Sequence, residues 1–157
     1  MADDIIQIHD EHLRATLARR ITALRSPARL MAGIANDLHG GVEDVLKAEG
    51  MPKWRGLSSV TKERRRERGH WPGKMLQEYG QLAASIQPDS GEAFAQVSTN
   101  LKKARTLHFG AKQGEFGRSK RGGPIPWGNI PARPFMVIPA HTRATIAQRA
   151  AKWIAAQ

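Results

Sequence analysis

Apolar residues recur at the period of an α-helix over the first third of the chain. After a short β-rich segment at 5–8 and a helix-capping Asp10, the first apolar stripe comprises Leu13, Leu17, Ile21 and Leu24. A second stripe follows Ser26-Pro27 and ends at Gly50 and Pro52, which terminate helices. We expect an edge strand at 5–8 and helices from Asp10 and over 27–49, the second kinked at Gly40-Gly41 because glycine is a poor helix former.

The remaining elements are shorter and their patterns change repeatedly. Residues 62–68 form a charged run that predicts a short helix capped by Thr61, and residues 74–86 are amphipathic. Alternation predicts a strand at 93–99, residues 104–110 read as a strand or turn, and 134–139 as a strand. A final helix spans 140–157, capped by Thr142, with a buried stripe of Ile146, Ala150, Trp153 and Ile154. The fold class is therefore α+β: N-terminal helices, a small mainly antiparallel sheet and a C-terminal helix.

Residues 110–130 lack hydrophobic periodicity and predict one long basic loop. They contain six Gly, two Pro and four Lys or Arg. Long loops in compact domains are usually functional. We expect a single domain over 1–157, with a helical part at 1–50 and an extended loop at 110–130 that is less ordered in the free subunit than in an assembly.

Composition and charge narrow the function classes. The 157 residues include no Cys, which excludes disulfide scaffolds, Cys-based zinc sites and thiol nucleophiles. The N-terminus has no apolar signal-peptide core and no apolar run reaches a membrane span, so we expect a soluble protein assembled in the cytoplasm. Residues 1–50 carry six of the 25 Lys+Arg and eight of the 14 Asp+Glu, and residues 51–157 carry the other 19 and six. Such a basic surface faces nucleic acid or an acidic protein ring, or is simply solvated.

Catalytic and metal-binding patterns are missing. The six His are scattered, and only His9 and His12 share a helix face, with no third ligand placed by the sequence. No phosphate-binding glycine loop appears, and Ser58, Ser59 and Ser85 have no nucleophile-elbow context. We expect no catalytic residue, no cofactor, no metal site and no enzyme activity.

Aromatic residues interleave with basic ones in the second half of the chain. Trp54, His70, Trp71, Phe116 and Trp127 could form a stacking platform for nucleic acid. No known nucleic-acid-binding pattern accompanies them, and Trp54 and Trp71 fit better as core residues under a loop. The interspersed Glu of 62–68 likewise favour a solvated helix face over phosphate contacts.

Four segments occur in the order of a known family. They are WRGLSSVTKER at 54–64, KMLQEYGQLAASI at 74–86, HFG at 108–110 and IPARPF at 130–135. Together they resemble the phage virion morphogenesis family, the tail-completion proteins of Mu-like and related tailed phages. The resemblance covers about residues 25–157, and IPARPF after HFG is its most distinctive part.

The resemblance implies a structural virion protein of the tail or neck, which completes or terminates the tail and joins it to the head connector. It implies a homo-oligomeric ring, with six-fold symmetry to match the tail tube, and as partners the tail tube protein, the connector and DNA in the lumen. Prolines hold Arg133 in an extended segment, so it can pair across an interface or close a loop within its own subunit. We expect interface residues at Arg133, Pro131, Pro134, Phe135, Trp127, Lys120 and Arg121. Contacts to DNA or an acidic partner are expected at Arg64, Arg65, Arg66, Arg68, Lys112 and Arg118.

Two other functions remain open from the sequence. One is a small basic nucleic-acid-binding protein that uses residues 62–74 and 112–121 on phosphates, with a steep dependence of affinity on salt. The other is a head-side assembly factor that leaves before the virion matures.

Overall fold

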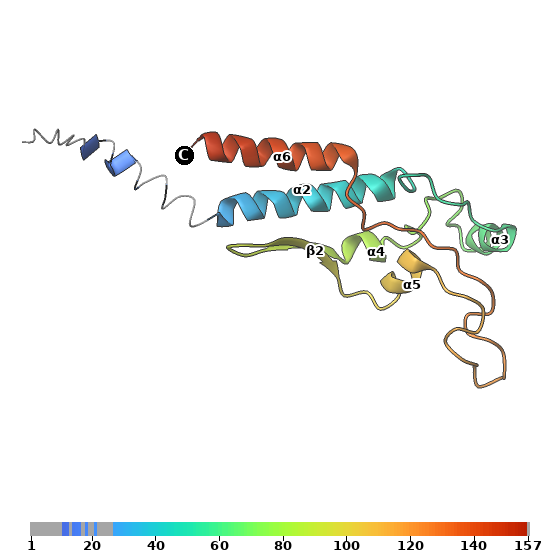
Figure 1. Cartoon of the computed structure of the whole chain (residues 1–157). Coiled ribbons are helices and arrows are strands. Elements are labelled where there is room, and N and C mark those ends of the chain that lie inside the picture. Colours follow the sequence, from blue (N-terminus) through green and yellow to red (C-terminus); the bar gives the residue numbers. More distant parts are fainter. Residues whose placement is uncertain (1–10, 13, 17, 19–20, 22–26, 157) are drawn as a thin grey trace, which may run out of the picture.

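A computed structural model describes residues 11–12, 14–16, 18, 21 and 27–156. The long helix α2 (Ala28–Lys47) lies between α6 (Ala140–Ala155) and a hairpin of β1 (Ile86–Ser90) and β2 (Ala95–Thr99) (Figure 1). The described residues between 11 and 21 are helical, in agreement with the first expected helix. The expected strand at 5–8 and the Asp10 cap lie outside the described residues.

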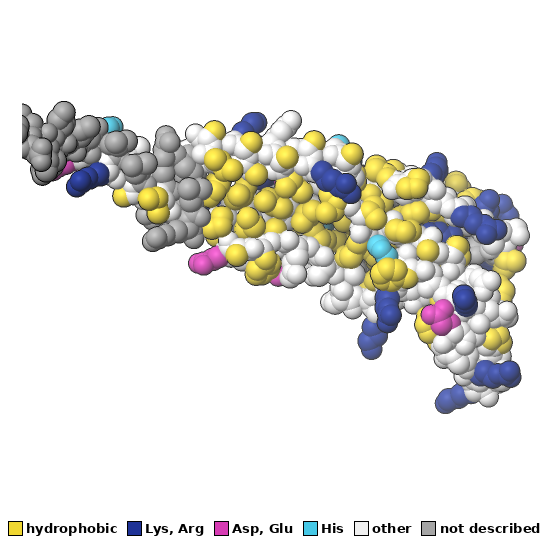
Figure 2. All heavy atoms as spheres, viewed as in Figure 1, with side chains coloured by type: hydrophobic (Ala, Val, Ile, Leu, Met, Phe, Trp, Pro, Cys, Tyr) yellow, Lys and Arg dark blue, Asp and Glu magenta, His cyan; other side chains and the backbone are white. Residues whose placement is uncertain are grey.

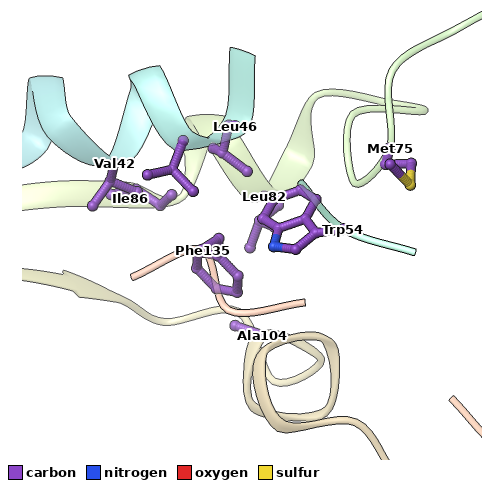
Figure 3. Close-up of a cluster of buried hydrophobic side chains, with 9 residues drawn as sticks. Val42, Leu46, Trp54, Met75, Leu82, Ile86, Ala104 and Phe135 are labelled. Carbon is purple, nitrogen blue, oxygen red and sulfur yellow. The ribbon is translucent and has the colours of Figure 1, made fainter. Parts of the chain in front are cut away.

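The core lies between α2 and the hairpin and continues toward α5 (Ala104–Phe109). The strands are antiparallel, with Ile86 opposite Thr99 and Ser90 opposite Ala95. Val42, Val45 and Leu46 of α2 pack into one cluster with the buried side chains Trp54, Met75, Leu82, Ile86, Ala104 and Phe135 (Figure 3). The α+β class predicted from the sequence is therefore confirmed.

The α2–α6 contact includes ion pairs and a close approach of small residues. Arg149 binds Asp37 through two hydrogen bonds of 2.6 and 2.8 Å, and His141 Nε2 lies 3.0 Å from Asp44 Oδ2. A Cβ atom on Gly41 would lie only 2.6 Å from Thr142 Oγ1, so the helices meet closely there. The helix predicted over 27–49 is confirmed as α2, which is continuous through Gly40-Gly41. Glycine at 41 therefore serves helix packing.

Two sequence predictions for residues 58–86 need correction. The charged run forms α3 (Ser59–Glu67), but its cap is Ser58, whose Oγ accepts a hydrogen bond from the Thr61 backbone N–H at 3.2 Å. In the amphipathic stretch 74–86 only α4 (Gln81–Ala84) is helical. Leu76 and Gly80 have positive φ, and this left-handed backbone stops a longer helix.

The segments at 104–110 and 134–139 also differ from expectation. The first is the short helix α5, not a strand. The second is extended but pairs with no strand among the described residues, because its prolines and its side-chain contacts replace a ladder.

The C-terminal helix is confirmed in extent, but its cap and its buried face differ. Pro139 precedes the first turn with no side-chain cap, and Thr142 is instead buried against Gly41. Ile146, Ala150 and Trp153 are half-buried, and Ile154 is exposed. The polar seam with α2 therefore leaves much of the apolar side of α6 uncovered.

Residues 110–130, the arm, leave the remainder of residues 27–156, the body, as a paired loop. The two sides are joined at Ala111 and Ile130 by reciprocal hydrogen bonds of 2.9 and 2.8 Å, and the Phe116 N–H donates to the Ile125 carbonyl at 2.7 Å. The Ser119 N–H donates to the Gly123 carbonyl at 2.8 Å near the tip. The arm projects away from the three layers (Figure 1), and hydrogen bonds across the loop hold its two sides together.

Candidate functional site

Three of the four family-like segments meet at one place in the body, which we call the junction: Trp54, His108, Arg133, Pro134 and Phe135. The Trp54 indole N–H donates to the Pro134 carbonyl at 3.1 Å. Phe135 is only 1% exposed and packs edge-on against the His108 ring, with 5.2 Å between centroids. These contacts join segments up to 80 positions apart. The segment 130–135 therefore holds distant parts of the chain together within the subunit.

His108 holds the junction through its ring nitrogen. The backbone N–H groups of Phe135 and Met136 both approach His108 Nδ1, at 3.4 and 3.5 Å. An accepting Nδ1 requires the neutral ring. Burial lowers the pKa of His108, which favours that neutral form. The structural role therefore explains this histidine without a metal or a proton transfer.

Gly110 allows the junction and the base of the arm to meet. Its φ is +78°, and a Cβ there would lie 2.6 Å from the Ile130 carbonyl oxygen and 2.8 Å from the Ala132 nitrogen. Only glycine fits such a backbone conformation and such an approach.

The Glu78 carboxylate lies close to three basic side chains from the charged run at 62–68 and the residues just after it. Arg65 Nε lies 3.2 Å and Arg68 Nη1 3.3 Å from its carboxylate oxygens, and His70 Nδ1 lies 3.5 Å away. Arg65 also donates to the Lys74 carbonyl at 3.0 Å and is buried. Burial alone would raise the pKa of Glu78, but the His70 ring and the Arg68 and Arg65 guanidinium groups outweigh it, so this pKa is lowered. Glu78 is a structural counter-ion.

The predicted contact residues of the charged run therefore occupy different environments. Arg65 is committed to the fold, and Arg66 pairs with Glu63 on the exposed side of α3. Arg64 lies over the exposed Trp127 ring, 5.3 Å from its centroid. This cation–π contact ties α3 to the arm.

Arg133 is a buried cation without a nearby carboxylate. It is 7% exposed, and its Nη2 donates to the Arg55 carbonyl at 3.3 Å, while its Nε has no hydrogen-bond partner among the residues that the structure describes. Among the described residues no carboxylate oxygen lies within 4.0 Å of its guanidinium. Burial and the like charge of Arg65 lower its pKa. The contact with Arg55 supports the role within its own subunit, while the missing counter-ion keeps the interface role open.

The other predicted interface and contact residues are exposed. Pro131 and Pro134 lie on the outside of the junction. Trp127 is 65% exposed. The exposed basic side chains of the arm are Lys112, Arg118, Lys120 and Arg121. Of the predicted set, Arg65, Arg133 and Phe135 are therefore buried, and the other residues are exposed on the arm, on or beside α3, or at the two prolines next to Arg133.

Sequence reasoning missed Glu78 and His108. The signal for Glu78 is that it is the single carboxylate between Glu67 and Asp89, next to a run rich in arginine. The signal for His108 is its place in the HFG segment, which indicates the family but does not indicate which residues His108 contacts.

The described charged groups form structural pairs rather than a reactive centre. Within the described ranges, no three His, Asp or Glu side chains are grouped so as to hold a metal ion. None of the described helices is long and apolar enough to cross a membrane.

The chain matches the phage virion morphogenesis family over residues 8–155. It belongs to that family, and it is a phage virion morphogenesis protein related to the tail. The resemblance read from the four segments is thereby confirmed. Searches of the curated proteins and of the solved structures returned no match.

Proposed function

We propose that this protein completes or terminates the phage tail and helps to join it to the head connector, acting as a ring rather than as an enzyme. Family membership supports a role in virion assembly. Because a tail tube is a closed symmetric structure, a protein that ends it matches its symmetry, for which we propose six copies. The proposed partners are the tail tube protein and the connector, with DNA passing through the lumen.

The observation that carries the ring is the apolar surface that the described residues leave exposed. Apolar side chains gather over α2 between α6 and the hairpin (Figure 2). Of the residues of α2, Met31, Ile34 and Leu38 are only half-buried. Phe109 is 71% exposed on α5 and Ile154 is 62% exposed on α6. Extended apolar surface on a small protein is typical of interaction sites.

A phage that lacks this gene provides the test. We expect its tails to lack a finished head-proximal end, its heads to remain unjoined, and the purified protein to restore joining when added to the extract. In sedimentation the protein should form a closed oligomer, alone or on tail tubes. A strict monomer that never joins tails contradicts the proposal.

The exposed basic arm favours DNA binding as the second candidate function. Phosphate contacts give a steep fall of affinity with salt, whereas assembly through apolar faces does not. The protein composition of purified virions distinguishes a head-side assembly factor from a tail protein. Such a factor is present in assembly intermediates and missing from purified virions.

A further inference from the structure

A groove between α2 and β1 lies on the body far from the arm. Two adjoining hollows of about 250 and 400 Å³ share Pro88 in their walls. Small side chains such as Ala32 and Ala35 line its α2 side, so a backbone segment can approach closely.

The groove end of the body carries carboxylates that are only partly paired with cations. Glu43 and Asp89 both line the hollows. Glu43 pairs with Lys47 at 3.1 Å, but Asp89 accepts only the neutral Gln96 amide, at 2.8 Å. Asp89 and Glu92, beside the hairpin turn, have no Lys, Arg or His side chain within 4.0 Å among the described residues.

The arm presents the opposite charge in a thin projection. Arg118, Lys120 and Arg121 are exposed, and within the described part of the chain none has a carboxylate within 4.0 Å. The tip is a tight turn, in which the Gly122 N–H donates to the Ser119 carbonyl at 2.9 Å. Exposed Phe116 and Ile125 add apolar surface behind the charges.

One chain cannot bring these two surfaces together. The arm leaves the body near α5, whereas the hairpin extends in the opposite direction (Figure 1). Figure 2 shows Lys and Arg side chains over the arm, beside an acidic side chain nearer the body, and acidic side chains at the hairpin end. Complementary surfaces at opposite ends of a chain suit a heterologous contact, which is repeated around a ring.

We infer that the arm tip of one copy docks into the α2–β1 groove of a second copy, with Arg118, Lys120 and Arg121 facing Asp89 and Glu92. This inference rests on the proposed ring and names the contact that closes it. The contact is head to tail, so every copy uses its arm once and its groove once.

Charge reversal tests the pairing in the full-length chain. We expect Arg118→Glu/Lys120→Glu to weaken self-association at least tenfold in sedimentation, and Asp89→Lys/Glu92→Lys to do the same. Combining the two pairs should restore association. The matched control is Lys102→Glu/Arg105→Glu, at two exposed positions outside both surfaces. It changes the net charge by the same amount as Arg118→Glu/Lys120→Glu.

Cysteine cross-linking tests the geometry, because the chain contains no native Cys. Ser119→Cys with Gln87→Cys, in the groove wall, should give a ladder of disulfide-linked oligomers longer than dimers. Ser119→Cys with Gln148→Cys, exposed on α6, should not.

The outcomes separate this contact from the ring itself. Closed oligomers that form without the ladder and tolerate both reversals overturn the docking while the proposed function stands. An arm variant that keeps self-association but loses binding to a DNA duplex makes the arm a phosphate-binding element and also overturns it. Wild-type protein that stays monomeric, both alone and on tail tubes, overturns both proposals.

Discussion

The junction and the arm are adjacent in the sequence but differ in what holds them. At the junction, an indole N–H, a histidine ring and the almost fully buried Phe135 join segments from across the chain. In the arm, the order comes from backbone hydrogen bonds across the loop, while Phe116 and Trp127 stay exposed. The junction therefore stabilises the subunit, whereas most side chains of the arm remain exposed. Substitutions in the two regions should separate folding from assembly.

The largest contrast is expected between two phenylalanines. Phe135→Ala should lower the free energy of unfolding by about 3–5 kcal/mol, because it opens a cavity in the core. Phe116→Ala should change it by less than about 0.5 kcal/mol, since the side chain is already half in solvent. Denaturant unfolding of both variants measures the difference, and similar losses would contradict the division between the two regions.

Glu78→Gln should have the second-largest effect on the body. Removing the carboxylate leaves the buried Arg65 without its counter-ion, at a cost of about 1–3 kcal/mol, less than for a fully buried pair because Glu78 is partly exposed. The pKa of Glu78 is lowered from 4.5 in the folded state, so its stabilising contribution is complete above that pH and is lost as the pH falls through the folded value. Thermal unfolding from pH 7 down to pH 3 should show this loss in the wild type and a smaller one in the variant.

Neighbouring glycines test the close helix contact within the body. Gly41→Ala places a methyl group against Thr142 and should destabilise by about 1–3 kcal/mol. Gly40→Ala meets nothing within 4 Å and should stabilise by about 0.5–1 kcal/mol through helix propensity. Equal shifts in melting temperature would mean that α6 can move away from the added methyl group without a loss of stability.

Arg133→Met distinguishes the two roles of the buried cation. The change keeps an apolar stem and removes a charge that has no carboxylate partner among the described residues, so we expect the stability of the isolated subunit to change by about 1 kcal/mol or less. Tail joining should fall if a neighbouring subunit supplies the counter-ion. A matched drop in melting temperature and assembly would instead assign Arg133 to its own subunit.

The smallest expected effect lies where the arm touches the body. Trp127→Ala and Arg64→Ala should each cost about 0.5 kcal/mol of stability, and a double-mutant cycle should give a coupling of similar size, the range of an exposed cation–π pair. Assembly assays on the same variants should show the larger change at Trp127. No coupling would mean that the arm is held by its backbone alone.

The sequence predicted the long elements well and the short ones poorly. The helices over 27–49 and 140–157 and the strand at 93–99 are present with small changes at their ends. The strand β1 was missed because it contains Pro88, Asp89 and Ser90, residues that strands usually avoid. It exists because β2 and α2 hold it in place.

The candidate site shows the same division. The resemblance located the segments that converge at the junction, and glycine and charge content marked the arm. The sequence alone did not separate Arg65, which is buried on Glu78, from Arg66, which lies in solvent beside Glu63. Adjacent positions in a charged run look alike until a partner from another segment is placed beside one of them.

The helical periodicity of apolar residues extends over several turns of α2 and α6. The sequence alone therefore determines these two helices wherever one helix face is buried. The α5 helix, the unpaired course of 134–139 and the burial of Arg65 and Arg133 depend on contacts between distant segments. Pieces of five or six residues carry too little local preference to resist those contacts, so tertiary packing decided them.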